Sequence, residues 1–185
     1  MDAPKVARRR STFLAPVWIA LLALAVLVAA SVMFWTRATT TTIVVVRHAE
    51  KQLGTIEDPP LTPEGDERAQ RLAGLFGDRT PVGAVRAIYA TSTRRAEATA
   101  SPLAARLGLR IIATDDAPAA LARRLRREQR GSVALVVAHS NTVPQIVAAL
   151  SGRGDIPPIA DDDFGTIYVV TIPDVGRASV LRLHY

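Results

Sequence analysis

The chain of 185 residues contains no cysteine, and it shows no internal repeats. The lack of cysteine excludes disulfide bonds, thiolate metal sites and a cysteine nucleophile, and it is compatible with an exported protein. A chain of this length has room for one domain of ordinary size and a short additional segment.

Charged residues are missing from one long stretch, Phe13 to Trp35. An apolar helix of this length crosses a hydrocarbon layer of about 30 Å. The stretch exceeds the roughly 7–15 residues of a signal-peptide h-region, and Trp18 and Trp35 suit the two membrane interfaces. We therefore expect residues 13–35 to form a transmembrane signal anchor. A cleaved signal peptide, for which "VAAS" offers small residues, and a buried core helix are the alternatives.

The charges on either side of this stretch predict its orientation. Residues 1–12 contain Lys5 and three arginines against one aspartate, whereas Arg37 is the only charge close behind the stretch. By the positive-inside rule the tail at 1–12 stays in the cytoplasm. The sequence thus predicts a single-pass protein of the cell membrane, in which a linker at 36–42 leads to an extracytoplasmic domain at 43–185.

The net charge of +6 and the pI of about 10.7 raise the question of nucleic-acid binding. Residues 38–185 hold 18 Lys and Arg against 16 Asp and Glu, so most of the excess belongs to the N-terminal segment. Because a nucleic-acid interface depends on a strongly basic surface, we expect no nucleic-acid partner.

β-rich and helical patterns alternate along residues 43–185. We expect strands at 43–47, 87–91, 110–113, 132–138, 166–172 and 178–183, and helices at 61–77, 93–108, 118–130 and 143–150. This alternation predicts a three-layer α/β/α sandwich with a mostly parallel central sheet, preceded by one transmembrane helix. Thr62 and Pro63 fit the N-cap and N1 positions of the first of these helices, and Gly108 fits the C′ position of the second.

Reactive side chains follow three of the predicted strands. In chain order they are Arg47, His48, Thr91, Ser92, Arg95, His139, Ser140 and Asn141. In open α/β sheets, ligands bind beyond the carboxyl ends of the parallel strands. We therefore expect two histidines and two arginines to meet at one edge of the sheet.

Four segments resemble the histidine phosphatase superfamily, the phosphoglycerate-mutase-like family, in their order and spacing. They are "VVVRHAEK", "LTPEGDERAQRLA", "YATSTRRAEATASPLAARLGL" and "VALVVAHSNT", and they span about residues 43–145. The resemblance is to the small phosphatases with an "RHA" motif. It implies a phosphoglycerate-mutase-like fold, a phosphoric monoester hydrolase activity like that of histidine acid phosphatases, and no metal or organic cofactor.

The resemblance also implies roles for single residues. His48 matches the nucleophile that becomes a phosphohistidine, Arg47 and Arg95 match the phosphate-binding arginines, and His139 matches the second histidine of the phosphate pocket. The chemistry of these side chains agrees, because a neutral imidazole is a competent nucleophile near pH 7 and a guanidinium binds two phosphate oxygens at once. The histidines could instead bind a metal ion, but two nearby arginines would repel it, so we expect no metal site.

The chain departs from the family pattern in three places. Ala49 and Ser140 stand where many members have glycine; both are small, and Ser140 can donate a hydrogen bond to phosphate. Asn141 cannot supply the acidic proton of the phytase-like "His-Asp" motif, so the general acid is open. By order along the chain we expect Asp115 or Asp116 in this role, ahead of Glu50 and Asp58.

Other polar residues have structural interpretations. Thr91 and Ser92 fit helix capping, Thr99 fits helix packing and His184 fits a structural role. The arginines of the 118–130 helix favour a solvated face, with contact to anionic lipid headgroups or steering of phosphorylated substrates as alternatives. The run "DDDF" at 161–164 is predicted to be a solvated loop.

The sequence thus predicts a membrane-anchored phosphatase that hydrolyses a phosphomonoester or phosphoramidate through a phosphohistidine on His48. Its substrate is expected to be a phosphorylated small molecule, an envelope phosphate or a phosphoprotein. A non-catalytic phosphate-binding or scaffold protein of the same fold is the alternative, which the lack of an obvious acid favours. A phosphomutase is disfavoured, because the stretch from Arg95 to His139 is too short for the large insertion that shields the intermediate from water in mutases.

Overall fold

The structure is a computed structural model that describes residues 15–37, 39–54, 57–77 and 83–185. The chain divides into two units, Met1–Ala38 and Thr39–Tyr185. The predicted tail at 1–12 and the first two residues of the predicted membrane span lie outside the described residues.

The first unit contains α1 (Ala15–Arg37). Its segment Val17–Phe34 has a mean hydropathy of 2.7, and none of its side chains is buried. Among the described residues, α1 is the one helix that is long and apolar enough to cross a membrane. The predicted apolar N-terminal helix is therefore confirmed, and its length and composition are those of signal sequences and of membrane anchors alike.

The second unit is built on a mixed sheet. Within the described residues, its six strands are arranged in the order β3-β2-β4-β1-β5-β6. They are β1 (Thr40–Arg47), β2 (Val85–Ala90), β3 (Ile111–Ala113), β4 (Val133–Ala138), β5 (Thr166–Pro173) and β6 (Ser179–His184). The first four strands are parallel, and β5 is antiparallel to both β1 and β6. The predicted α/β class with a mostly parallel sheet is confirmed.

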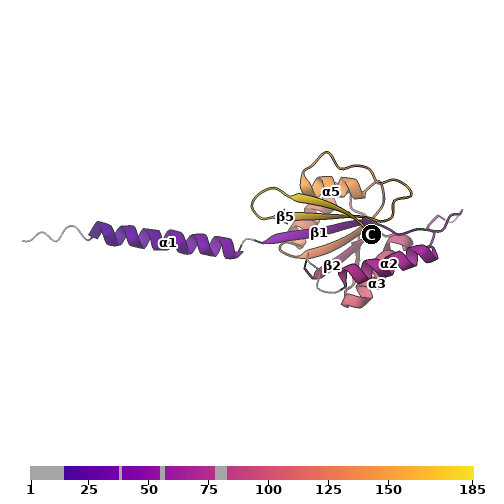
Figure 1. The fold of residues 1–185 in the computed structure, drawn as a ribbon, viewed down its shortest axis with the longest axis horizontal. Helices are drawn as coiled ribbons and strands as arrows, with labels where there is room; N and C mark the ends of the chain where they lie inside the picture. The colour runs from indigo at the N-terminus through magenta and orange to yellow at the C-terminus, as the bar shows by residue number, and fades with distance from the viewer. Residues whose placement is uncertain (1–14, 38, 55–56, 78–82) are drawn as a thin grey trace, which may run out of the picture. The chain divides into compact units, whose positions relative to one another are not determined.

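Helices cover both faces of this sheet (Figure 1). On one face lie α4 (Pro118–Glu128) and α5 (Val143–Ser151), and on the other lie α2 (Pro63–Phe76) and α3 (Arg94–Leu107). Successive side chains of a strand point to opposite faces. Ile43 of β1 therefore packs in one layer and Val44 in the other, which explains why this strand is apolar throughout.

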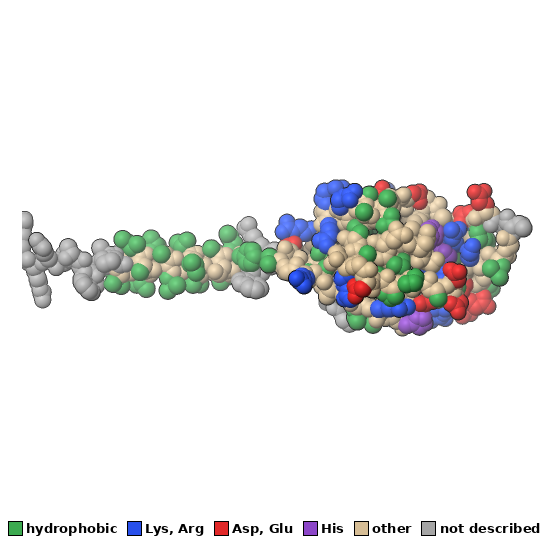
Figure 2. Space-filling model, turned by 90° about the horizontal axis from the view of Figure 1, so that it is seen from above, with side chains coloured by type: hydrophobic (Ala, Val, Ile, Leu, Met, Phe, Trp, Pro, Cys, Tyr) green, Lys and Arg blue, Asp and Glu red, His purple; other side chains and the backbone are tan. Residues whose placement is uncertain are grey.

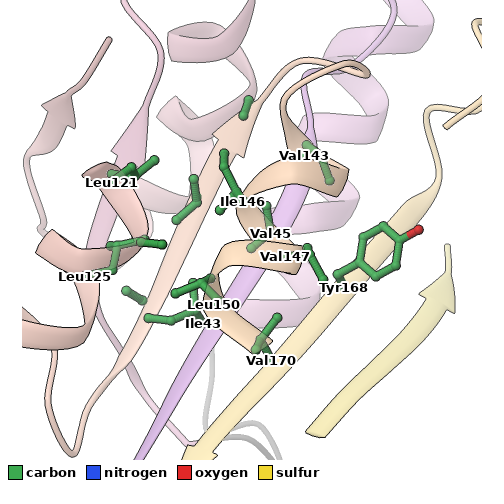
Figure 3. Close-up of a cluster of buried hydrophobic side chains, with 14 of the residues drawn as sticks. Ile43, Val45, Leu121, Leu125, Val143, Ile146, Val147, Leu150, Tyr168 and Val170 are labelled. Atoms are coloured by element: carbon green, nitrogen blue, oxygen red, sulfur yellow. The ribbon is translucent and has the colours of Figure 1, made fainter. Parts of the chain in front are cut away.

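Figure 3 shows the layer between the sheet and the helices α4 and α5. Leu121 and Leu125 of α4 and Ile146 and Leu150 of α5 are buried there against Ile43 and other strand residues. Burial of one such side chain contributes about 1.5–3 kcal/mol to stability. The two apolar layers thus hold β1 and β4 firmly, and with them the residues that follow these strands.

Local sequence signals set several element boundaries as predicted. The Thr62 side chain accepts a hydrogen bond from the Gly65 N–H at 3.1 Å as the N-cap of α2. Gly108 ends α3 at a φ of 64°, a left-handed conformation that glycine adopts without steric cost. The strand β1, however, begins at Thr40 rather than at residue 43, because its first residues pair with β5.

Candidate functional site

The carboxyl ends of β1 and β4 lie side by side. Arg47 is paired with Ala138 at the end of the parallel ladder, and the N–H of His48 donates to the Ala138 carbonyl at 2.9 Å. His139 follows directly on β4. Beyond these ends lies a pocket of about 620 Å³, called here the His48 pocket, whose lining residues are Arg47, His48, Lys51, Leu53, Arg95, His139, Ser140, Asn141, Asp161 and Phe164.

His48 is held in one tautomer. Its Nδ1 lies 2.8 Å from the Ala49 carbonyl oxygen. Because a carbonyl can only accept a hydrogen bond, Nδ1 carries the proton, and the neutral ring has its free lone pair on Nε2. Burial lowers the pKa of His48 to about 4, with smaller contributions in the same direction from His139, Arg95 and Arg47 and an opposing one from the hydrogen bond to Ala49. The ring is thus neutral at physiological pH, and a neutral imidazole can act as a nucleophile.

His139 lies close to His48. The two imidazole rings have their centroids 5.3 Å apart and meet edge to face at 68°. Burial lowers the pKa of His139 as well, with further lowering by Arg95 and Arg47. A neutral imidazole donates a hydrogen bond from one ring nitrogen and accepts one at the other. The donating nitrogen of His139 can therefore bind an oxygen of a phosphoryl group.

Arg47 is almost fully buried, with 6% of its surface exposed. Its Nη1 donates to the backbone carbonyls of Ala160, Asp161 and Asp163 at 2.9, 2.9 and 3.1 Å. Its guanidinium carbon lies 4.0 Å from the centroid of the Phe164 ring, in a cation–π contact. Burial lowers the pKa of Arg47, but arginine stays protonated in proteins. The loop at 160–164 thus fixes the cation in one orientation.

Arg95, in the first turn of α3, is the second cation of the pocket. Its Nη1 donates to Asp58 at 3.0 Å. Within the described part of the chain, the Nε atoms of Arg47 and Arg95 are buried and have no hydrogen-bond partner. Both arginines also line the His48 pocket, and guanidinium groups at a pocket favour an anionic ligand.

Thr99 connects the loop of His48 to the helix of Arg95. The Ala49 N–H donates to the Thr99 hydroxyl oxygen at 2.9 Å, and that hydroxyl donates to the Arg95 carbonyl at 2.7 Å. Thr99 is fully buried. It therefore has more than the packing role expected from the sequence, because it holds the nucleophile loop and α3 in register.

The acidic residues considered as proton donors are held elsewhere. Asp115 accepts a hydrogen bond from the Ser92 N–H at 3.0 Å, and the Ser92 hydrogen bonds lower its pKa. Asp116 pairs with Arg124 at 3.3 Å. Neither aspartate is among the described residues that line the His48 pocket, although the charge of Asp115 acts on the pKa of His139.

Glu50 and Asp58 are also held by arginines. Burial alone would raise the pKa of Glu50, but a two-pronged ion pair with Arg68, with contacts of 2.6–2.9 Å, outweighs this effect and lowers it. Asp58 is the partner of Arg95. Among the described residues, the acid that lines the pocket is Asp161.

Sequence reasoning missed Lys51, Leu53, Asp161 and Phe164 as lining residues. Lys51 follows the "RHAE" motif directly, so its position was a usable signal. The loop at 161–164 was predicted to be solvated, and the single aromatic residue after three aspartates was the only hint of its contact with Arg47. No group of three or more His, Asp or Glu in the described residues is placed to hold a metal ion.

Comparison with known proteins agrees with this geometry. Residues 43–117 match the model of the histidine phosphatase superfamily, branch 1. No curated protein shows a significant match to the chain.

Solved structures share the fold. The SixA protein from Nakamurella multipartitia is 20% identical, with a TM-score of 0.61 over 80% of this chain and 97% of that one. The protein histidine phosphatase SixA complexed with tungstate is 21% identical, with a TM-score of 0.62 over 77% and 96%. A mycobacterial glucosyl-3-phosphoglycerate phosphatase is 18% identical, with a TM-score of 0.53 over 76% and 100%. The segment that carries Arg47, His48 and Arg95 therefore matches branch 1 of the histidine phosphatase superfamily, and the solved structures share the fold of the domain.

Proposed function

We propose that this protein is a membrane-anchored phosphatase that hydrolyses a phosphoramidate or an activated phosphomonoester through a phosphohistidine on His48. The observation that carries the proposal is the hydrogen bond of His48 Nδ1 to the Ala49 carbonyl, which leaves Nε2 as the free nucleophile. Arg47, Arg95 and His139 line the same pocket.

In the first step, Nε2 of His48 bonds to phosphorus while the bond between phosphorus and the leaving oxygen or nitrogen breaks. The guanidinium groups of Arg47 and Arg95 and the ring of His139 bind the oxygens on which negative charge develops. Since the loop at 160–164 and Asp58 already hold the two arginines in place, little reorganisation is needed when the phosphoryl group transfers.

In the second step, water attacks the phosphohistidine. The water oxygen bonds to phosphorus, the P–N bond breaks and its electron pair returns to Nε2. Inorganic phosphate leaves with the protons of the water, and His48, with its proton still on Nδ1, is neutral again. The low pKa of His48 favours this cycle, because an imidazole that resists protonation is ready to attack again.

The leaving group also needs a proton, and this need favours one class of substrate. Glu50 and Asp115 have lowered pKa values and are ionised at neutral pH, which makes them poor donors. An alkoxide leaves slowly without an acid, whereas an imidazole has a pKa near neutrality and can take its proton from water. Phosphohistidine is therefore a better candidate substrate than a sugar or serine phosphate. A phosphohistidine phosphatase among the structural neighbours is in line with this preference.

The proposed arrangement at the membrane follows from α1. We propose that α1 remains uncleaved as an anchor, that residues 1–12 lie in the cytoplasm, and that the domain lies on the other side of the membrane. The support is the apolar segment Val17–Phe34 together with the basic residues that precede it.

The test is hydrolysis of p-nitrophenyl phosphate by the full-length chain in detergent with EDTA present. We expect turnover to survive EDTA, to fall about 1000-fold or more in His48→Ala, and to fall by about 100-fold or more in Arg95→Ala. His184→Ala removes an exposed histidine outside the pocket and should keep most of the activity.

Substrate preference is measured with a phosphohistidine peptide and a phosphoserine peptide of the same sequence. Since a positioned general acid contributes about 100-fold to 10,000-fold, we expect kcat/KM to favour phosphohistidine by at least about 100-fold. Equal rates would contradict the proposed substrate class. A folded wild type that binds phosphate but turns over none of these compounds would favour the non-catalytic alternative.

A further inference from the structure

A second pocket, called here the arginine pocket, lies outside the His48 pocket. It has a volume of about 610 Å³, and Arg126, Arg153 and Arg177 line it together with Gly152 and Gly176. Its walls come from the last turn of α4, the end of α5 and the turn between β5 and β6.

The charges of the arginine pocket are poorly balanced. Arg126 donates to the Leu150 carbonyl, which carries no net charge. Arg153 pairs with Asp155 at 2.5 Å. Within the described ranges, Arg177 makes no hydrogen bond or ion pair. Three guanidinium groups therefore share one carboxylate, and such a pocket favours an anion that accepts several hydrogen bonds, above all a phosphate group.

The turn that carries Arg177 also holds the start of the domain. Thr39 donates to the Asp174 carboxylate from its N–H at 2.9 Å and from its hydroxyl at 2.8 Å, and Arg130 donates to the same carboxylate. Thr39 is two residues beyond the end of α1 at Arg37. If α1 is an anchor, only one residue separates its end from the residue that this turn holds.

The same turn exposes an apolar side chain. Val175 is 65% exposed, between Asp174 and the Gly176–Arg177 pair. An apolar residue beside exposed basic residues is typical of segments that sit at the boundary of headgroups and acyl chains. Figure 2 shows several Lys and Arg side chains at one end of the second unit, whereas acidic and basic side chains are mixed at the other.

We propose that the arginine pocket binds the phosphate headgroup of an anionic phospholipid in the bilayer that holds α1. The proposal rests on the anchoring part of the proposed function. Each arginine close to an anionic membrane surface gains favourable electrostatic energy, and the pocket adds hydrogen-bond donors for one phosphate.

Binding of the arginine pocket to the bilayer determines the direction in which the His48 pocket opens. The arginine pocket lies at the end of the sheet where β1 begins, and the His48 pocket lies where β1 ends. Eight residues of extended strand separate the two ends by about 25 Å. The His48 pocket then opens away from the bilayer, so it acts on phosphoryl groups of the aqueous phase and not on lipids of the same leaflet.

The test uses the full-length chain in nanodiscs of phosphatidylcholine, with or without phosphatidylglycerol. Because the chain has no cysteine, Ser179→Cys gives a single labelling site on an exposed residue next to the pocket. We expect the emission of an environment-sensitive fluorophore at this site to shift to shorter wavelength only when phosphatidylglycerol is present. A label at Glu67→Cys, exposed near the start of α2, should show no such shift.

Charge variants distinguish binding in the arginine pocket from general electrostatic attraction of the protein to the anionic membrane. Arg153→Gln with Arg177→Gln should reduce the ratio of docked to undocked protein by on the order of tenfold. Arg71→Gln with Arg94→Gln removes the same charge outside the pocket and should leave the shift in place. An equal loss in both pairs would mean attraction by overall charge and would overturn the proposal.

Each remaining outcome is also decisive. A disc-bound chain whose label does not respond to phosphatidylglycerol would overturn docking alone. A shift caused by inorganic phosphate in phosphatidylcholine discs, with none from phosphatidylglycerol, would assign the pocket to a soluble phosphate compound instead. Failure to co-purify with phosphatidylcholine discs would contradict the anchor, and loss of p-nitrophenyl phosphate turnover in the same discs would contradict the phosphatase function separately.

Discussion

The His48 pocket and the arginine pocket have nearly the same volume, about 620 and 610 Å³, and both contain arginines, but they hold them differently. Arg47 is buried, bonded to three carbonyls and stacked on Phe164. Arg177 lies exposed in a turn, and its guanidinium has no partner among the described residues. The difference separates a site that must position a reacting phosphoryl group from one that only has to hold an anionic headgroup.

The strongest test of this contrast replaces arginine by lysine in both pockets. Arg47→Lys keeps the charge but loses the planar fork, the contacts to the loop carbonyls and the cation–π geometry. We expect kcat/KM for p-nitrophenyl phosphate to fall about 100-fold to 1000-fold. Steady-state kinetics of the folded variant, with folding checked by circular dichroism, measures the effect.

The matched change in the other pocket is Arg177→Lys. An ammonium group attracts an anionic headgroup as a point charge, so we expect the lipid-dependent shift of the Ser179→Cys label to stay within about twofold of the wild type. A loss as large as that of the double glutamine variant would show that the arginine pocket also depends on guanidinium geometry, and the contrast would fail.

A second test concerns pH, because the His48 pocket is lined by two histidines and the arginine pocket by none of the described ones. With a pKa of about 4, most of His48 is still neutral at pH 5, whereas a histidine of ordinary pKa would be only about 3% neutral. We therefore expect the acid limb of kcat/KM to lie near pH 4, in a profile measured from pH 3.5 to about 8. A limb near pH 6.5 would contradict the burial of the nucleophile.

The same pKa has a consequence for stability. Between about pH 6.5 and pH 4, the unfolded chain binds a proton at His48 that the folded chain does not, and His139 acts in the same direction. The free energy of unfolding should therefore fall as the pH drops through this range. Urea unfolding of His48→Gln should show a weaker dependence on pH than the wild type.

A smaller effect on catalysis than that of Arg47→Lys is expected at Thr99. Thr99→Val removes the acceptor of the buried Ala49 N–H, which should lower the free energy of unfolding by about 1–3 kcal/mol and kcat/KM several-fold. Thr99→Ser keeps the hydroxyl and should recover most of the activity. If valine and serine behave alike in kcat while both destabilise, the residue serves packing and does not position the nucleophile loop.

Much of the fold was predictable because it depends on local patterns. The run "IVVV" predicted a strand buried on both faces, and Thr62 and Gly108 predicted their helix ends. The first residue of β1 was harder to predict, because it depends on pairing with β5, more than 120 residues further along the chain. The local sequence around residue 40 does not indicate this pairing.

The site residues that directly follow strands were predictable from the sequence. The contacts made by loops that fold back over the site were not. Arg47 and His139 meet because the parallel strands β1 and β4 end together. The contact of Phe164 with Arg47 depends on the path of a loop without regular structure, and the Glu50–Arg68 pair joins a strand end to a helix face. The arginine pocket combines three segments far apart in sequence, so a reading of the charges along α4 alone found only some of its residues.

The loop that holds Arg47 does two different things with its backbone and its side chains. The loop at 160–163 holds the guanidinium through backbone carbonyls, which every amino acid possesses, while the Asp161 side chain lines the pocket. Substitutions at residue 161 can therefore change which leaving group is accepted while the backbone carbonyl of that residue keeps its hydrogen bond to Arg47. This separation marks residue 161 as the place to begin directed evolution of substrate range.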